Sequence, residues 1–157
     1  MDERARIRMN DDEVDAFLRE GRKLQLATIN PDGTPHLVTM YYALLDGRVA
    51  FWTYRAAQKA RNLDRDPRTT CLVEAGDGYF DLRGVQITGL ARRIDDLADV
   101  AEVGRAISHQ LPDRGPGRST EEYVQRAARK RVAYVVEPTR VVSWDHRKLA
   151  GAPQAAP

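Results

Sequence analysis

Residues 51–63 read Phe-Trp-Thr-Tyr-Arg-Ala-Ala-Gln-Lys-Ala-Arg-Asn-Leu and place a strand end directly before a helix start. The aromatic-rich strand predicted over residues 49–53 ends at Thr53, and the helix predicted over residues 56–65 follows Arg55. Unpaired amide groups and the dipole at a helix start favour an anion. Lys59 and Asn62 are three residues apart and share a helix face, and Arg55 lies one turn before Lys59. We therefore expect these donors to bind a phosphate.

The same residues have a plainer interpretation as a basic helix surface that faces water. Runs of charged side chains usually face solvent, and the spacing alone does not separate the two interpretations.

On either side of this stretch, hydrophobic residues alternate with period two between tight turns. Strands are predicted over residues 24–29, 35–45 and 49–53, joined by turns at 30–33 and 46–47. Further strands are predicted over 69–74, 79–94 and 132–144, with bulges or bends at Gly84 and Gly89 and an interruption at Pro138. Six antiparallel strands favour a closed or nearly closed barrel, because closure removes exposed edges.

Helices are predicted outside this barrel, which makes the fold class mainly β (α+β). Asn10 and Glu13 form a capping-box pattern before an apolar helical face, a second helix covers residues 97–110, and Ser119 caps a third with Glu122. We expect one domain over residues 1–150 and a disordered tail over 151–157. The segment 111–118 is a loop that acts either as a lid or as a connector.

Composition excludes several classes of protein. Hydrophobic residues are 42% and charged residues 31% of the chain, and no apolar run approaches a membrane span. The net charge of +2 is too small to indicate a nucleic-acid partner. Residues 1–8 do not have the pattern of a signal peptide, so we expect a cytoplasmic protein without membrane or nucleic-acid partners.

No motif indicates a metal site or a protein-borne catalytic group. The three histidines, His36, His109 and His146, have no metal-ligand spacing, and the single cysteine, Cys71, is expected to be a buried thiol. Hydrolase, nucleotide-binding and dinucleotide-binding glycine motifs are missing. The catalytic residues are therefore unknown.

The stretch around Lys59 resembles the phosphate-binding strand and helix of the pyridoxamine-phosphate-oxidase-like superfamily. The pattern Thr-x-Arg-x-x-x-Lys-x-Arg-Asn-Leu of its deazaflavin-dependent branch is matched from Thr53 to Leu63. Residues 26–35 and 64–68 agree as well, and the likeness is good over residues 14–95 and loose elsewhere. The strand before position 42 lacks the Arg-x-x-x-x-Lys pattern of true pyridoxamine-phosphate oxidases.

The resemblance implies a six-stranded antiparallel split β-barrel that forms a homodimer with cofactor sites at the subunit interface. It implies that main-chain groups near Val38 and Thr39 reach the ring, although core alternation explains these side chains equally well. It also implies that the C-terminal segment around Trp144, Arg147 and Lys148 reaches the partner's cofactor; an ordinary exposed strand end is the alternative. The implied cofactor-binding residues are Val38, Thr39, Thr53, Tyr54, Arg55, Lys59, Arg61, Asn62, Trp144 and Lys148.

The implied function is an oxidoreductase that uses coenzyme F420 and acts on an unsaturated small molecule. Arg61 and Lys148 would meet the acidic tail that distinguishes F420 from FMN, and Tyr41, His146 or water would supply any proton. Two alternatives stay open: an FMN-dependent oxidase or reductase of the same fold, and a non-catalytic flavin, deazaflavin or haem carrier.

Overall fold

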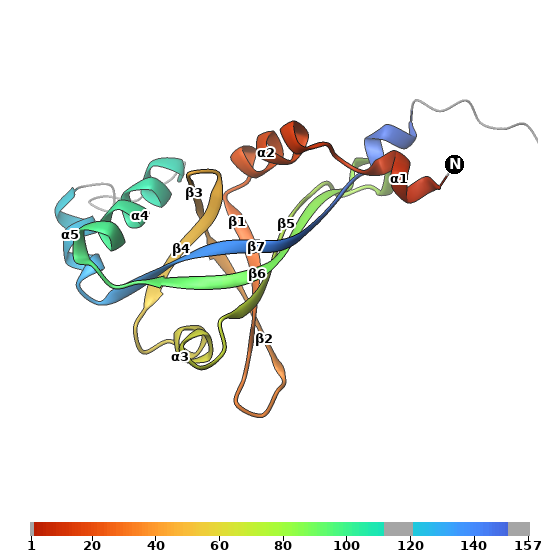
Figure 1. Cartoon of the computed structure of the whole chain (residues 1–157). Coiled ribbons are helices and arrows are strands. Elements are labelled where there is room, and N and C mark those ends of the chain that lie inside the picture. Colours follow the sequence, from red (N-terminus) through yellow and green to blue (C-terminus); the bar gives the residue numbers. More distant parts are fainter. Residues whose placement is uncertain (1, 112–120, 151–157) are drawn as a thin grey trace, which may run out of the picture.

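A computed structural model describes residues 2–111 and 121–150 (Figure 1). The strands are β1 Lys23–Ile29, β2 Pro35–Tyr41, β3 Ala43–Leu45, β4 Arg48–Tyr54, β5 Arg68–Ala75, β6 Arg83–Ile94 and β7 Arg131–Asp145. The helices are α1 Glu3–Ile7, α2 Asp11–Glu20, α3 Gln58–Arg65, α4 Leu97–Gln110 and α5 Glu121–Ala128, with 3-10 turns η1 Tyr79–Asp81 and η2 His146–Leu149.

The strands form one antiparallel sheet in the order β2-β1-β5-β6-β7-β4-β3. Its two edge strands, β2 and β3, are separated in the chain by Tyr42 alone, so the sheet must curl until its edges meet at that residue. The Tyr42 hydroxyl donates to the Leu18 carbonyl of α2 at 2.6 Å, which ties this corner to a helix. The predicted split barrel is confirmed.

The sheet has seven strands within the described residues, where six were predicted. The predicted strand over residues 35–45 divides at Tyr42, because β2 pairs with β1 whereas β3 pairs with β4. A period-two pattern cannot show this division, since a strand that leaves one partner for another keeps its alternation.

Two buried clusters lie on the two faces of the sheet. The barrel interior contains large side chains such as Leu26, Phe51 and Tyr134, each no more than 1% exposed. On the other face, α4 and α5 pack against β4 and β7 through small residues including Ala50, Val103 and Val124. These two helices lie together at one end of the sheet, whereas α1 and η2 lie at the other (Figure 1).

Local signals placed the helix boundaries well. In α2, the Asn10 side chain accepts from the Glu13 amide at 2.9 Å and the Glu13 carboxylate accepts from the Asn10 amide at 2.7 Å. The predicted capping box is therefore confirmed, as is the helix over residues 97–110. Helix α3 begins two residues later than predicted, which leaves Arg55 in the turn before it.

Two glycines of β6 serve different purposes. The register between β6 and β7 shifts between Thr88 and Gly89, opposite Pro138, so a bulge is present where it was predicted. At Gly84 the pairing is regular, and the indole of Trp144 occupies the space that a Cβ would need. Of the bulge or bend predicted at Gly84, the bulge is therefore not found, and close packing of the Trp144 ring explains why this position is glycine.

Several expectations fall outside the described residues: the Ser119 cap, most of the 111–118 loop and the tail over 151–157. Within the described residues, no helix combines the length and the apolar character needed to cross a membrane.

Candidate functional site

The junction between β4 and α3 presents hydrogen-bond donors without an internal partner. Thr53 is 5% exposed at the end of β4. The N-cap residue of α3 is Ala57, which has no side chain able to accept from the first amide groups of the helix. No acidic residue lies in the first turn. The start of α3 therefore offers amide donors and a positive dipole end to an anion.

Lys59 lies in this first turn, and its side chain is partly buried. Burial lowers its pKa below the ordinary value of 10.5, because a desolvated ammonium is less stable than a hydrated one. Within residues 2–111 and 121–150, no carboxylate or carbonyl compensates this charge. Lys59 is thus a partly desolvated cation without a counter-ion among these residues, and it lies beside an uncapped helix start. Both features favour binding of a phosphate.

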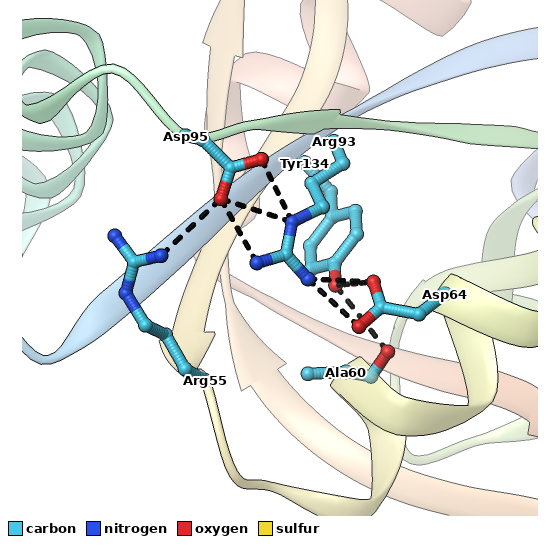
Figure 2. A network of polar contacts seen from close by, with 6 residues as sticks. All are labelled: Arg55, Ala60, Asp64, Arg93, Asp95 and Tyr134. Carbon is cyan, nitrogen blue, oxygen red and sulfur yellow. Dashed lines mark hydrogen bonds and ion pairs between the residues drawn. The ribbon is translucent and has the colours of Figure 1, made fainter.

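Arg55 is held beside this site by one ion pair. Its guanidinium Nη1 lies 3.3 Å from Oδ1 of Asp95, and both side chains are about half exposed. Asp95 is held more firmly by Arg93, whose Nη2 lies 2.9 Å from the same oxygen, and this contact is the main reason that the pKa of Asp95 is lowered. Figure 2 shows Arg55 on the outer side of Asp95, so its other guanidinium donors are free of this pair.

Arg93 links the site helix to the sheet (Figure 2). It donates to both carboxylate oxygens of Asp64 on α3, at 2.6 and 2.8 Å, while it holds Asp95 at the end of β6. The hydroxyl of Tyr134 on β7 lies 3.3 Å from the same Asp64 carboxylate, and burial raises the pKa of this phenol to about 12. Paired, charge-assisted contacts of this kind fix the position of α3 relative to β6 and β7.

Asn62 differs from the other predicted phosphate ligands because it is fully buried. Its amide nitrogen donates to Thr28 Oγ1 and to Asn30 Oδ1, both at 3.0 Å, and its oxygen accepts from Gln58 at 2.9 Å. Both N–H donors are therefore engaged in tying α3 to β1. Its role in phosphate binding stays a prediction, but in this structure it positions the helix.

Tyr54 lies on the opposite face of β4 from Thr53, since neighbouring strand residues alternate. The guanidinium of Arg131 stacks 4.3 Å from the Tyr54 ring and 4.6 Å from the Trp52 ring. The structure thus places Tyr54 and Thr53 on opposite faces of β4. The Tyr54 ring is covered by Arg131, a residue that no sequence pattern indicated.

Val38 and Thr39 lie on β2, at an edge of the sheet. Val38 packs against the barrel interior, whereas Thr39 faces outward and donates to Gln25 Oε1 at 2.9 Å. Among the described strands, β2 pairs with β1 alone, so one side of its main chain is open. An open edge is what main-chain contacts to a ligand require.

Trp144 lies near the end of β7 and Lys148 lies in η2. Figure 1 shows this end of β7 beside α1 and away from α3. Trp144 packs over Gly84. The Lys148 ammonium donates to the Arg8 carbonyl at 2.8 Å and pairs with Glu13 at 2.6 Å. Within one protomer, these two residues do not join Thr53 and Lys59, so they could reach such a site only on a partner.

Arg61 is exposed on α3, with no bonded partner for its side chain among the described residues. The two predicted proton donors lie elsewhere. Tyr41 ends β2, and His146 begins η2, where its Nδ1 donates to the Tyr79 carbonyl at 2.8 Å.

Sequence reasoning missed His36 and the Arg93 network. His36 lies opposite Thr28 in the β1–β2 pairing, and its buried Nδ1 has no hydrogen-bond partner in the part of the chain described. Asp95 and Asp96 both precede α4. Asp96 does cap α4, but Asp95 pairs with arginines instead. The Arg93–Asp64 and Arg55–Asp95 contacts join residues 29 and 40 positions apart, so no local pattern could indicate them.

The other titratable groups offer no alternative centre. Cys71 is buried, and burial raises the pKa of its thiol to about 12. Within the residues that the structure describes, no three His, Cys, Asp or Glu side chains are grouped closely enough to bind a metal ion.

Comparison with known families gives one clear match. The family model described as pyridoxamine 5'-phosphate oxidase matches residues 10–145, which is most of the chain. None of the curated proteins compared with the chain matches it.

Several solved structures share the fold. A conserved hypothetical protein, Rv2991, from Mycobacterium tuberculosis is 36% identical with a TM-score of 0.87, covering 100% of this chain and 98% of its own. A protein named F420 reductase is 24% identical with a TM-score of 0.58, covering 81% and 94%. The haem storage protein HutZ from Vibrio cholerae is 15% identical with a TM-score of 0.66, covering 85% and 94%.

Proposed function

Because the chain belongs to the pyridoxamine 5'-phosphate oxidase family, we propose that it binds a phosphorylated flavin-type cofactor at the β4–α3 junction and acts as an oxidoreductase. The observation that carries this proposal is the partly buried Lys59 ammonium, which has no counter-ion within the described residues. A partly buried cation is costly unless it is paired, and an anionic phosphate group would pair it.

In this proposal, Thr53 and Lys59 contact the phosphate, together with the first amide groups of α3. Arg55 contacts the same anion. Its ion pair with Asp95 is a single contact, so Arg55 can leave Asp95 for the phosphate more easily than the other members of the network can leave their partners. Arg93, Asp64 and Asn62 hold α3 in place. The unpaired N–H and C=O groups of β2 beside Val38 and Thr39 bind the polar edge of the ring.

We propose coenzyme F420 as the preferred cofactor and FMN as the alternative. Such a cofactor, when bound, supplies hydride transfer to or from an unsaturated small molecule. The match from Thr53 to Leu63 supports F420, and exposed Arg61 places a further positive charge on α3 for an acidic tail. This electrostatic preference should weaken as salt is added.

We also propose a homodimer with the sites at its interface. Leu37 and Tyr41 lie on the same face of β2, on either side of Thr39, and are 65% and 49% exposed. Exposed large apolar side chains on one face mark an interaction surface. Trp144 and Lys148 are engaged within their own protomer, by Gly84 and by Glu13, so this site does not include them, and their reach to a partner's cofactor stays a prediction.

A non-catalytic carrier is the second candidate. One observation favours it: His146, one of the two predicted proton donors, lies in η2 and bonds to the Tyr79 carbonyl, so of the two only Tyr41 lies on the strand proposed to contact the ring. The fold shared with a haem storage protein is consistent with such a role.

Fluorescence titrations with FMN and F420 test the proposal directly. We expect tight binding of F420, weaker binding of FMN, and oxidation of the reduced bound cofactor by at least one unsaturated acceptor from a broad panel. Tight binding without turnover across the panel would support the carrier, and binding of neither cofactor would reject the site.

A further inference from the structure

A hollow of about 560 Å³ lies between α1 and the last part of β7. Figure 1 shows these two elements at the end of the sheet remote from α4 and α5. Small-molecule sites typically have volumes of about 300–1,000 Å³. The lining includes three cationic side chains and three apolar ones: Arg4, Arg8, Arg140, Ile7, Val142 and Trp144. Of these, Arg140, Val142 and Trp144 alternate along one face of β7.

The walls of this hollow are fixed by contacts between distant parts of the chain. The Met9 amide donates to Ser143 Oγ at 3.1 Å, which attaches the N-terminal segment to β7. Lys148 donates to the Arg8 carbonyl at 2.8 Å and pairs with Glu13 at 2.6 Å, which attaches the same segment to η2. The hollow is therefore a built feature of the fold, since these contacts hold α1 against β7.

The three arginines carry charge that the described residues do not neutralise. None of their guanidinium groups makes an ion pair or hydrogen bond in this part of the chain, whereas Arg83, Arg92 and Arg105 each pair with a carboxylate. Two carboxylates of neighbouring segments are already engaged, Glu13 by Lys148 and Asp145 by Arg147. Asp2 and Glu3, beside Arg4 at the start of α1, make no ion pair among the described residues, so the three guanidinium groups of the hollow stay unpaired.

The apolar side chains supply a complementary surface for an aromatic or aliphatic body. Val142 is 37% exposed, and the partly buried indole of Trp144 lies against Gly84, where any larger residue would displace it. An inorganic anion would leave the apolar side chains exposed to water. A neutral aromatic molecule would leave the guanidinium groups without a hydrogen-bond acceptor. A ligand with both an anionic group and an apolar body satisfies both parts of the lining.

We propose that this hollow binds a small aromatic carboxylate, with the carboxylate against Arg4, Arg8 and Arg140 and the ring against Trp144 and Val142. Arginine pairs with carboxylates through two parallel hydrogen bonds, and aromatic rings stack favourably. The site is separate from the β4–α3 junction, and the inference does not depend on the cofactor.

Isothermal titration calorimetry of the full chain tests this with 1-naphthaleneacetate and its neutral analogue, 1-naphthaleneacetamide. We expect the acid to bind about tenfold more tightly than the amide and to lose this advantage as salt is added. Equal binding of the two, or no binding of the acid at about 1 mM, would overturn the proposal.

The double variant R8Q/R140Q is expected to weaken binding of the acid about tenfold while binding of the amide stays unchanged. R6Q is the matched control, because Arg6 is exposed on the same helix but does not line the hollow. An equal loss in R6Q would show a non-specific charge effect and reject the site. Displacement of the acid by FMN would assign the hollow to the cofactor and would also reject a separate site, whatever the outcome at the β4–α3 junction.

Discussion

Lys59 and Lys148 have a similar sequence context but differ in their ion pairing in the folded protein. Both lie in basic clusters near a strand end, and both were expected to bind an anionic cofactor. Lys59 is partly buried and has no counter-ion in the described residues, whereas Lys148 pairs with Glu13 and holds the N-terminal segment. The contrast shows that a lysine is available to a ligand only where the protein has not already neutralised it.

Asn62→Ala should produce the largest change in stability, because Asn62 ties α3 to β1. Removal of its amide leaves Thr28 and Asn30 without their buried partner and should lower the free energy of unfolding by about 2–3 kcal/mol. Urea unfolding measures this. Gln58→Ala is the control on the same helix, with an expected loss below about 1 kcal/mol. Equal losses would show that Asn62 does not have this special positioning role.

Lys59→Ala should weaken cofactor binding by about 1.5–3 kcal/mol, because the phosphate loses one charged partner. The melting temperature should not fall, since the substitution also removes an unpaired, partly desolvated charge. Fluorescence titration and thermal melts measure the two effects. Unchanged affinity would remove Lys59 from the site and with it the main support for the proposed function.

The affinity for cofactor should also fall at alkaline pH. Phosphate binding requires the protonated ammonium, and burial lowers the pKa of Lys59, so the loss should begin below the ordinary value of 10.5. Affinity is retained below that pKa and declines as the pH rises through it. In Lys59→Arg the guanidinium stays charged, so the decline should disappear. The same decline in both variants would assign it to another group.

Lys148→Ala should have the smallest effect, a decrease in melting temperature of about 1–3 °C with cofactor affinity unchanged. Its ammonium is committed to Glu13 and to the Arg8 carbonyl. Differential scanning fluorimetry and the same titration check this. A loss of affinity comparable with that of Lys59→Ala would instead support the expectation that Lys148 reaches the cofactor of a partner subunit.

Much of the fold could be predicted because its signals are local. The capping box at Asn10, the helix over residues 97–110 and the bulge at Gly89 opposite Pro138 each depend on backbone chemistry within a few residues or on the special geometry of glycine and proline. The division of the strand at Tyr42 was not predictable, because it depends on a change of partner that leaves the alternation intact.

The sequence by itself determined a mainly β chain with helices outside the sheet, and a strand-to-helix junction rich in donors at residues 51–63. Only the tertiary structure decided which of those donors are free. Asn62 donates to Thr28, and Tyr54 stacks under Arg131. Arg55 pairs with Asp95. Lys59 alone among these has a charge that the described residues do not neutralise. The physical reason is that side-chain identity is local, whereas burial and charge pairing are set by residues tens of positions away.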